Sequence, residues 1–279
     1  MLNPKSHLAI NKVLLMDKPH QVTPDVVALP AHFPIPGMGF LPVNAFVIRA
    51  AEPVLVDTGM GIDSEEFMKA LKTVIDPKDL RWVWLTHDDA DHTGSIQKVL
   101  EAAPAARLAV NALGMLRMCT AWRVPMDRCC WVNPGDSISV GDRKLTAVRP
   151  PTFDNPTTIG AYDDRSQAFF SADSFGGITS SQVQDADEIA EADLSQGMTA
   201  WACADSPWVH MVQPSKFNEG LDRIRKMDPK MILSAHLPPA RSKTEQFLKL
   251  LETFPTSQPF VAPNQAALEM MLTQMRGKS

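Results

Sequence analysis

Apolar and polar positions change along the chain in short runs that predict a mixed α/β protein. Two β-branched, apolar runs at 44–50 and 53–59 are separated by two residues and predict a hairpin. The segment 63–75 has an amphipathic pattern and predicts a helix with one apolar face, formed by Phe67, Ala70, Leu71 and Val74. The next apolar run, at 81–87, is short enough to be a buried strand. Strand, helix and strand therefore follow one another in the first third of the chain.

The pattern changes towards the middle of the chain. Helical segments at 94–104 and 111–119 flank an extended segment, and the region 131–173 then holds four short runs typical of an antiparallel sheet. Residues 230–236 form the last strong strand. We also expect an irregular, proline- and glycine-rich segment at 1–40, a helical insert at 174–226 and a C-terminal helix within 260–279.

Composition narrows the class of protein. The chain has 279 residues, of which 44% are apolar and 21% charged, so it can bury a large core, and the order of elements favours one α/β domain over 1–279. A net charge of -5 and the absence of a basic run argue against a nucleic-acid partner. The first twenty residues are interrupted by Pro4, Lys5, Lys12 and Asp17, so they resemble neither a signal peptide nor a membrane span. We expect a cytoplasmic protein without a membrane partner.

The four cysteines show no C-x-x-C spacing or zinc-finger pattern and are interpreted as reduced, structural thiols. The adjacent pair Cys129 and Cys130 leaves a redox role open.

The stretch VWLTHDDADHTGS at 83–95 contains the clearest chemical signal. Three aspartates and two histidines follow a buried strand within six residues, and carboxylates this close repel one another unless a cation or many hydrogen-bond donors hold them. A solvated loop with helix-capping aspartates is the simpler alternative, but capping needs only one aspartate. The sequence therefore favours a metal site.

Other residues that can bind a metal, aspartate and histidine, follow the ends of further predicted strands. Asp154 lies in TFDNP, Asp173 in FFSADSFGG and His236 in ILSAHLPP, each at the end of an apolar or β-prone run. A catalytic metal site draws its ligands from several such ends and keeps one coordination position open. Open α/β sheets also bind ligands at the carboxyl ends of their strands.

These motifs resemble a known superfamily. The spacing His-x-Asp-x-Asp-His before Thr-Gly, with LVDTGM about thirty residues upstream, is similar to the metal-binding signature of the metallo-β-lactamase superfamily, His-x-His-x-Asp-His. Asp57 and Gly59 match the DTG that closes a strand beneath the metal site in that family. The resemblance covers about Asn44 to His236 and implies a metallo-β-lactamase-like αββα sandwich.

Where this chain departs from the usual signature, it resembles a particular branch of the superfamily. A carboxylate at Asp89 resembles the flavodiiron and oxygen-binding di-iron proteins, which carry His-x-Glu-x-Asp-His. The resemblance implies that Asp173 bridges two metals. It implies a first metal held by His87, Asp89 and Asp154, and a second held by Asp91, His92 and His236. Asp154 stands where the family has a histidine, so the alternative is that it only forms a hydrogen bond nearby and leaves the first site weaker or vacant.

Three functions stay open at this point. The first is a di-iron protein that binds or reduces O₂ or NO, with iron as the expected metal of both ions and zinc or manganese as the alternatives. It would take electrons from a separate donor, because no flavin domain is recognised in the chain, or it would act as an O₂ sensor. The second is a hydrolase of an ester, thioester, lactone, amide or phosphodiester, with a pocket formed by 32–40 and the insert near Trp201 and Trp208. The third is a degenerate binding protein. The resemblance also allows a homodimer.

Overall fold

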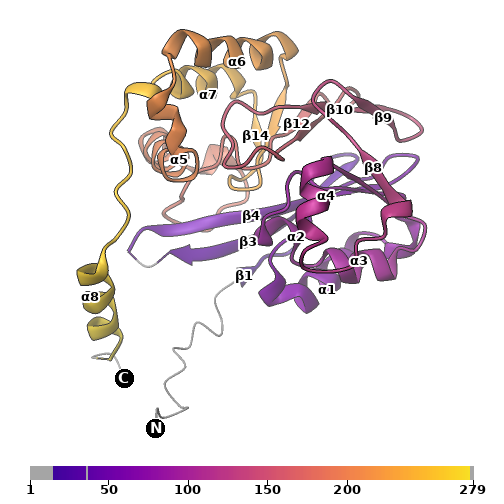
Figure 1. The fold of residues 1–279 in the computed structure, drawn as a ribbon. Helices are drawn as coiled ribbons and strands as arrows, with labels where there is room; N and C mark the ends of the chain where they lie inside the picture. Colours follow the sequence, from indigo (N-terminus) through magenta and orange to yellow (C-terminus); the bar gives the residue numbers. More distant parts are fainter. Residues whose placement is uncertain (1–14, 36, 277–279) are drawn as a thin grey trace.

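The computed structural model describes residues 15–35 and 37–276, which form two stacked β-sheets with helices on both outer sides (Figure 1). This arrangement confirms the expected αββα sandwich. The first sheet has the order β1-β3-β4-β5-β6-β7-β8, and β2 pairs with β3. Its strands are β1 (Leu15–Met16), β2 (His20–Thr23), β3 (Val26–Ile35), β4 (Gly39–Ile48), β5 (Val54–Val56), β6 (Trp82–Trp84), β7 (Arg107–Val110) and β8 (Cys129–Trp131).

The second sheet has the order β14-β13-β12-β11-β10-β9, and only the β12–β13 pair in it is parallel. Its strands are β9 (Ser137–Ser139), β10 (Lys144–Val148), β11 (Gly160–Asp163), β12 (Ala168–Phe170), β13 (Met231–Leu233) and β14 (Ala240–Arg241). Four of these strands, β9 to β12, lie within the region 131–173, as the sequence predicts.

Helices from the two halves of the chain cover opposite faces of the sandwich (Figure 1). The first sheet is covered by α1 (Ser64–Val74), α3 (Ile96–Ala102) and α4 (Ala112–Met118), with the short α2 (Ala90–Thr93) at its edge. The second sheet is covered by α5 (Glu191–Asp205), α6 (Pro214–Met227) and α7 (Thr244–Leu251). The last helix, α8 (Gln265–Arg276), follows an extended segment and lies within the predicted C-terminal range. Single 3₁₀ turns are η1 (Gly61–Asp63), η2 (Pro77–Asp79), η3 (Met126–Arg128), η4 (Ala186–Glu188), η5 (Pro207–Met211) and η6 (Phe254–Thr256).

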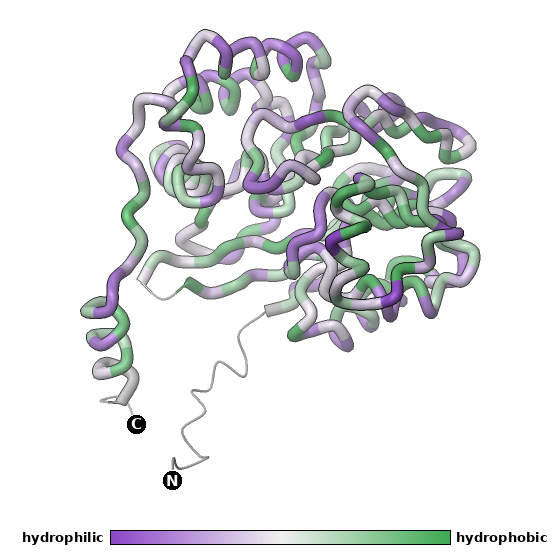
Figure 2. Tube along the Cα trace, viewed as in Figure 1, coloured by the Kyte–Doolittle hydropathy of each residue, from purple (hydrophilic) through white to green (hydrophobic). Residues whose placement is uncertain are grey.

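Alternation along the central strands creates three layers of core. In β5, Val54 and Val56 face the space between the sheets, whereas Leu55 packs against the helices of the first half. In β13, Met231 and Leu233 face the same inter-sheet core, and Ile232 faces α5–α7. Side chains that point to opposite sides of a strand must both be apolar when both faces are covered. Figure 2 shows the result, with green apolar runs on the inner strands and alternating purple and green on the outer helices.

The expectation of an irregular segment at 1–40 was wrong for the residues that the structure describes there. Three strands lie in this range, and β3 alone spans ten residues paired with β4. The prolines misled the prediction, since proline lacks the N–H that a central strand needs. Pro30 accepts a hydrogen bond from the Asp17 amide through its carbonyl, so its backbone groups face β1 and leave the β3–β4 ladder intact. Pro34 lies four residues further on and faces the same side.

The other expected elements are present with small changes of boundary. The predicted hairpin is the antiparallel β4–β5 pair, and the helix at 63–75 is α1 with Phe67 and Leu71 buried. In the expected helical insert, helical structure begins at Ala186 rather than 174. The four cysteines are free thiols, and Cys129 and Cys130 point to opposite faces of β8. Among the described residues, no helix is both long and apolar enough to cross a membrane.

Candidate metal centre

The candidate ligands meet at one edge of the sandwich because of the strand directions. His87 follows β6, while Asp173 and His236 follow the parallel strands β12 and β13. Asp154 precedes β11, which runs antiparallel to β12, so the start of β11 lies beside the end of β12. The Ile159 amide donates to the Thr86 carbonyl at 2.8 Å and joins the two sheets at this point. Ligands from both sheets are thereby brought to the same edge.

Three of the expected ligands form what we call the histidine-rich group: Asp91, His92 and His236. Asp91 Oδ2 lies 3.5 Å from His92 Nε2 and 3.4 Å from His236 Nε2. Both imidazoles are buried. One ligand atom of each of the three residues lies within 4.8 Å of the other two, which is close enough for all three to surround one ion.

Three others form the carboxylate-rich group: His87, Asp89 and Asp154. His87 Nε2 lies 3.9 Å from Asp89 Oδ2 and 4.0 Å from Asp154 Oδ1. The His87 side chain is fully buried, whereas the two carboxylates are partly exposed. This group also meets the 4.8 Å criterion, with a single nitrogen and two carboxylates.

Asp173 lies between the two groups. Its Oδ1 is 3.0 Å from His92 Nε2 and 3.1 Å from His236 Nε2, and its Oδ2 is 3.2 Å from His87 Nε2. Each oxygen of this buried carboxylate therefore faces a different group. A carboxylate bridging two ions has this arrangement.

Hydrogen bonds orient each of the three imidazoles. The Nδ1–H of His236 donates to the Pro42 carbonyl at 2.7 Å, since a carbonyl can only accept. His92 Nδ1 lies 2.9 Å from Asp57 Oδ2. The Thr86 hydroxyl donates to the same carboxylate, which leaves its oxygen to accept from His87 Nδ1 at 3.1 Å. All three Nε2 atoms are therefore free to bind a cation, and such second partners fix the tautomer of metal-binding histidines.

The free ligand atoms fit a metal centre better than they fit the bare protein. His87 Nε2, His92 Nε2 and Asp173 Oδ1 are buried without a hydrogen-bond partner. A buried polar atom without a partner is costly, and three in one place need a common explanation. Bound cations would satisfy all of them at once.

The close packing of histidines and carboxylates also shifts the pKa values of these side chains in the metal-free protein. Burial alone lowers the pKa of a histidine, yet the Asp173 carboxylate outweighs it and raises the pKa of both His87 and His236. Burial, together with the neighbouring Asp154, raises the pKa of Asp89 to about 6. Without metal, the site therefore takes up protons in place of cations.

The glycines of the signature allow a close approach of two loops. The Thr58 amide donates to the His92 carbonyl at 2.8 Å, and the Gly94 amide donates to the Gly59 carbonyl at 2.8 Å. A Cβ on Gly94 would lie 2.0 Å from the Gly61 nitrogen, so no side chain fits there. This contact holds Asp57 beneath His92.

The remaining aspartate of the cluster, Asp88, faces away from both groups. Its carboxylate pairs with Arg117 Nε at 2.9 Å and accepts from the Thr157 hydroxyl at 2.8 Å. Asp89 occupies the position before α2 but makes no capping hydrogen bond; it accepts instead from Asn155 Nδ2 at 3.1 Å. Helix capping therefore does not explain Asp89.

Sequence reasoning missed one acidic residue at this site, Asp205 at the end of α5. One of its oxygens lies within 4.8 Å of oxygens of Asp154 and Asp173. Asp205 follows no strand, and no motif marks it. The structure thus brings together all seven expected residues and adds an eighth.

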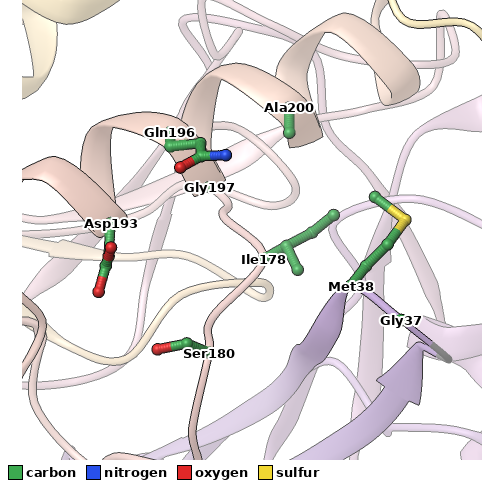
Figure 3. A pocket seen from close by; sticks show the side chains of 8 residues that line it. All are labelled: Gly37, Met38, Ile178, Ser180, Asp193, Gln196, Gly197 and Ala200. Carbon is green, nitrogen blue, oxygen red and sulfur yellow. The ribbon is translucent and has the colours of Figure 1, made fainter.

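The described residues also form a pocket of about 290 Å³ between the turn at 37–38 and α5 (Figure 3). Its lining includes Met38, Ile178, Asp193 and Gln196, and none of the seven expected ligands. Trp201 and Trp208 do not line this pocket; they lie at the metal-centre side, where the Trp201 ring packs against His236 with centroids 4.6 Å apart.

The fold and the site define a protein of the metallo-β-lactamase superfamily. The family model described as "ODP family beta lactamase" matches residues 41–236, so the chain belongs to this family. The chain is 26% identical over 214 residues to the anaerobic nitric oxide reductase flavorubredoxin of Salmonella typhi, covering 74% of this chain and 43% of that protein. The chain spans about half the length, or less, of the curated relatives it matches.

Solved structures agree on the fold. Rubredoxin oxygen:oxidoreductase from Desulfovibrio gigas superposes with a TM-score of 0.75 at 18% identity, covering 87% of this chain and 63% of that one. The flavodiiron protein from Giardia intestinalis superposes with a TM-score of 0.75 at 15% identity, covering 86% and 60%. The family model and these matches together confirm the superfamily resemblance that the motifs indicate.

Proposed function

We propose that this protein holds a dinuclear metal centre, with one ion in each group and Asp173 between them. The observation that carries the proposal is the position of Asp173, whose two buried oxygens each face the free Nε2 atoms of a different group. This arrangement satisfies buried atoms that otherwise have no partner.

We further propose that the ions are iron and that the centre binds or reduces O₂ or NO. Four of the seven ligands are aspartates, and oxygen-rich sets favour harder ions over zinc. The names of the similar proteins, a nitric oxide reductase flavorubredoxin and a rubredoxin oxygen:oxidoreductase, support the same chemistry. When bound, two irons supply the redox chemistry that either gas requires.

The protein's own residues would position the ions and limit access of water. Asp57, the Pro42 carbonyl and Thr86 hold the three imidazoles in orientation. Trp201 covers one side by packing on His236, and its indole N–H donates to the Asp173 carbonyl at 3.1 Å. Reduction of a gas also needs electrons, and we propose a separate donor for them.

Anaerobic loading with Fe²⁺ followed by titration with O₂ or NO tests this function. The proposal predicts an absorption change that saturates at a fixed ratio of gas to protein, and its loss in Asp173→Asn. The matched control is Asp88→Asn, which alters an aspartate of the same loop that faces Arg117 instead of the centre. An iron-loaded parent that shows no response to either gas would overturn the gas chemistry while leaving the metal centre in place.

A further inference from the structure

One acidic side chain outside the seven expected ligands reaches the same centre. One oxygen each of Asp205, Asp154 and Asp173 lie within 4.8 Å of one another. Oxygen ligands at ~2.0–2.2 Å from one ion are at most about 4.4 Å apart. The three oxygens are therefore close enough to share a cation after a local adjustment of the side chains.

Two tryptophans hold Asp205 in this position. The Trp201 indole N–H donates to the Asp173 carbonyl at 3.1 Å, and the Trp208 indole N–H donates to the Phe153 carbonyl at 2.7 Å. These acceptors belong to the central carboxylate residue itself and to the residue preceding Asp154. Hydrogen bonds on both sides of Asp205 thus hold this part of the chain against the backbone at Asp173 and at Phe153, the residue before Asp154.

Asp205 has few polar partners in the part of the chain that the structure describes. Its only hydrogen bond there comes from the Ser206 hydroxyl at 3.0 Å, and no lysine or arginine forms an ion pair with it. Three carboxylates this close repel one another, and a cation among them would offset the repulsion.

A second observation, separate from the carboxylates, points to a cation at this place. His87 Nε2 is buried, has no hydrogen-bond partner, and lies 3.2 Å from Asp173 Oδ2 and 4.0 Å from Asp154 Oδ1. His87 Nε2 and one oxygen of Asp205 therefore both lie beside Asp154 and Asp173.

We propose that Asp205 is an eighth ligand, an oxygen donor to the ion held by the carboxylate-rich group. This inference rests on the proposed dinuclear centre and extends it. The group has one histidine where related signatures supply more nitrogen, and Asp205 adds a donor from a different element. The resulting set of one nitrogen and several oxygens selects further for iron or manganese.

Metal binding by Asp205→Asn tests the role of this residue. Metal-free parent and variant are titrated with Mn²⁺ by calorimetry, and bound metal per chain is measured by elemental analysis after dialysis. We expect the parent to bind two ions and the variant to bind one of them about 10–100-fold more weakly. Asp193→Asn is the matched control, because Asp193 is exposed on the same helix; it should bind as the parent does.

The design separates the possible failures. If the parent bound no metal, the dinuclear centre itself would be refuted. If the parent bound two ions and Asp205→Asn bound both with unchanged affinity, only the role of Asp205 would be overturned. Melting of the metal-free proteins shows whether the variant is folded, since removal of a repelled charge should not lower its melting temperature. Asp205→Ser repeats the test with a smaller side chain.

Discussion

The two halves of the candidate centre differ in what holds them. In the histidine-rich group, His92 and His236 are both buried, and each has its Nδ1 held by a carboxylate or a carbonyl. In the carboxylate-rich group, the side chains of Asp89 and Asp154 are 34% and 23% exposed, and they repel each other. A pre-oriented, buried set of ligands binds its ion more tightly than a partly exposed set with fewer orienting contacts. We therefore expect the second ion, in the histidine-rich group, to be the more firmly held.

Removal of the shared ligand should erase this difference. Asp173→Asn takes away the charge that faces both groups and should abolish tight binding of both ions. The loaded parent gains about 2.7 kcal/mol of stability when free metal exceeds the dissociation constant 100-fold, and the variant should lose this gain. Thermal melting with and without Mn²⁺ measures it. A variant that is stabilised by metal as much as the parent would show that Asp173 binds neither ion.

Substitutions confined to one group should separate the two ions. His92→Ala should empty the histidine-rich group and weaken the other, while Asp154→Ala should leave one ion bound with nearly parental affinity. Calorimetric titration of both variants, with metal per chain measured after dialysis, shows which of the two ions is held more tightly. If Asp154→Ala lost both ions and His92→Ala lost only one, the ion of the histidine-rich group would not be the more firmly held.

The orienting carboxylate should matter nearly as much as a ligand. Asp57→Asn keeps the size of the side chain and tolerates the backbone φ of 58°, but it removes the charge that holds His92 Nδ1–H. We expect metal affinity to fall about 10–100-fold without loss of the fold. Unchanged affinity would mean that burial alone orients His92.

The pH dependence of stability should differ between metal-free and loaded protein. His87, His92 and His236 have pKa values raised above 6.5 in the folded state, because nearby carboxylates outweigh the effect of burial. Their contribution to stability is therefore complete below pH 6.5 and is lost as the pH rises through the higher folded values. The metal-free protein should melt at a lower temperature at pH 9 than at pH 6.5. The loaded protein should show a weaker dependence in the same experiment, because cations replace these protons. Equal slopes would argue against metal at the imidazoles.

The smallest effect on metal affinity is expected from Asn155, which donates a hydrogen bond to Asp89 of the carboxylate-rich group. Asn155→Ala removes the hydrogen bond to Asp89 Oδ1, worth roughly 0.5–1.5 kcal/mol, or a few-fold in affinity for the first ion. Binding of the other ion should not change. A loss of both ions would show that Asn155 has a wider structural role.

The sequence predicts much of this centre because its ligands follow apolar runs. His87, Asp173 and His236 each come directly after a buried strand, and strand direction brings such positions to one edge. Asp154 needed the antiparallel pairing of β11 and β12, which the alternating pattern also indicates. Asp205 could not be found this way, because it ends a helix and reaches the centre only through packing of α5 over the second sheet.

Other features depend on geometry that a linear pattern does not contain. The strand β3 carries two prolines and reads as a loop, yet it pairs along its full length because those prolines face the other side. Asp88 and Asp89 are identical neighbours in the sequence, but Asp88 pairs with Arg117 at 2.9 Å, whereas Asp89 lies between Arg117 and His87, 3.9 Å from each. Ligand identity inside the cluster therefore follows from spacing within the family signature rather than from residue type.

Metal content of the purified protein tests the central claim most directly. The protein would be purified without added metal, its chain mass verified, and each metal measured per chain by elemental analysis. The account predicts two ions per chain, with iron as the main metal, and about one in Asp154→Ala. Two zinc ions would refute iron as the metal and turn the search to hydrolysis. A parent with no bound metal, and no uptake of Fe²⁺ or Mn²⁺ on anaerobic loading, would contradict the dinuclear centre.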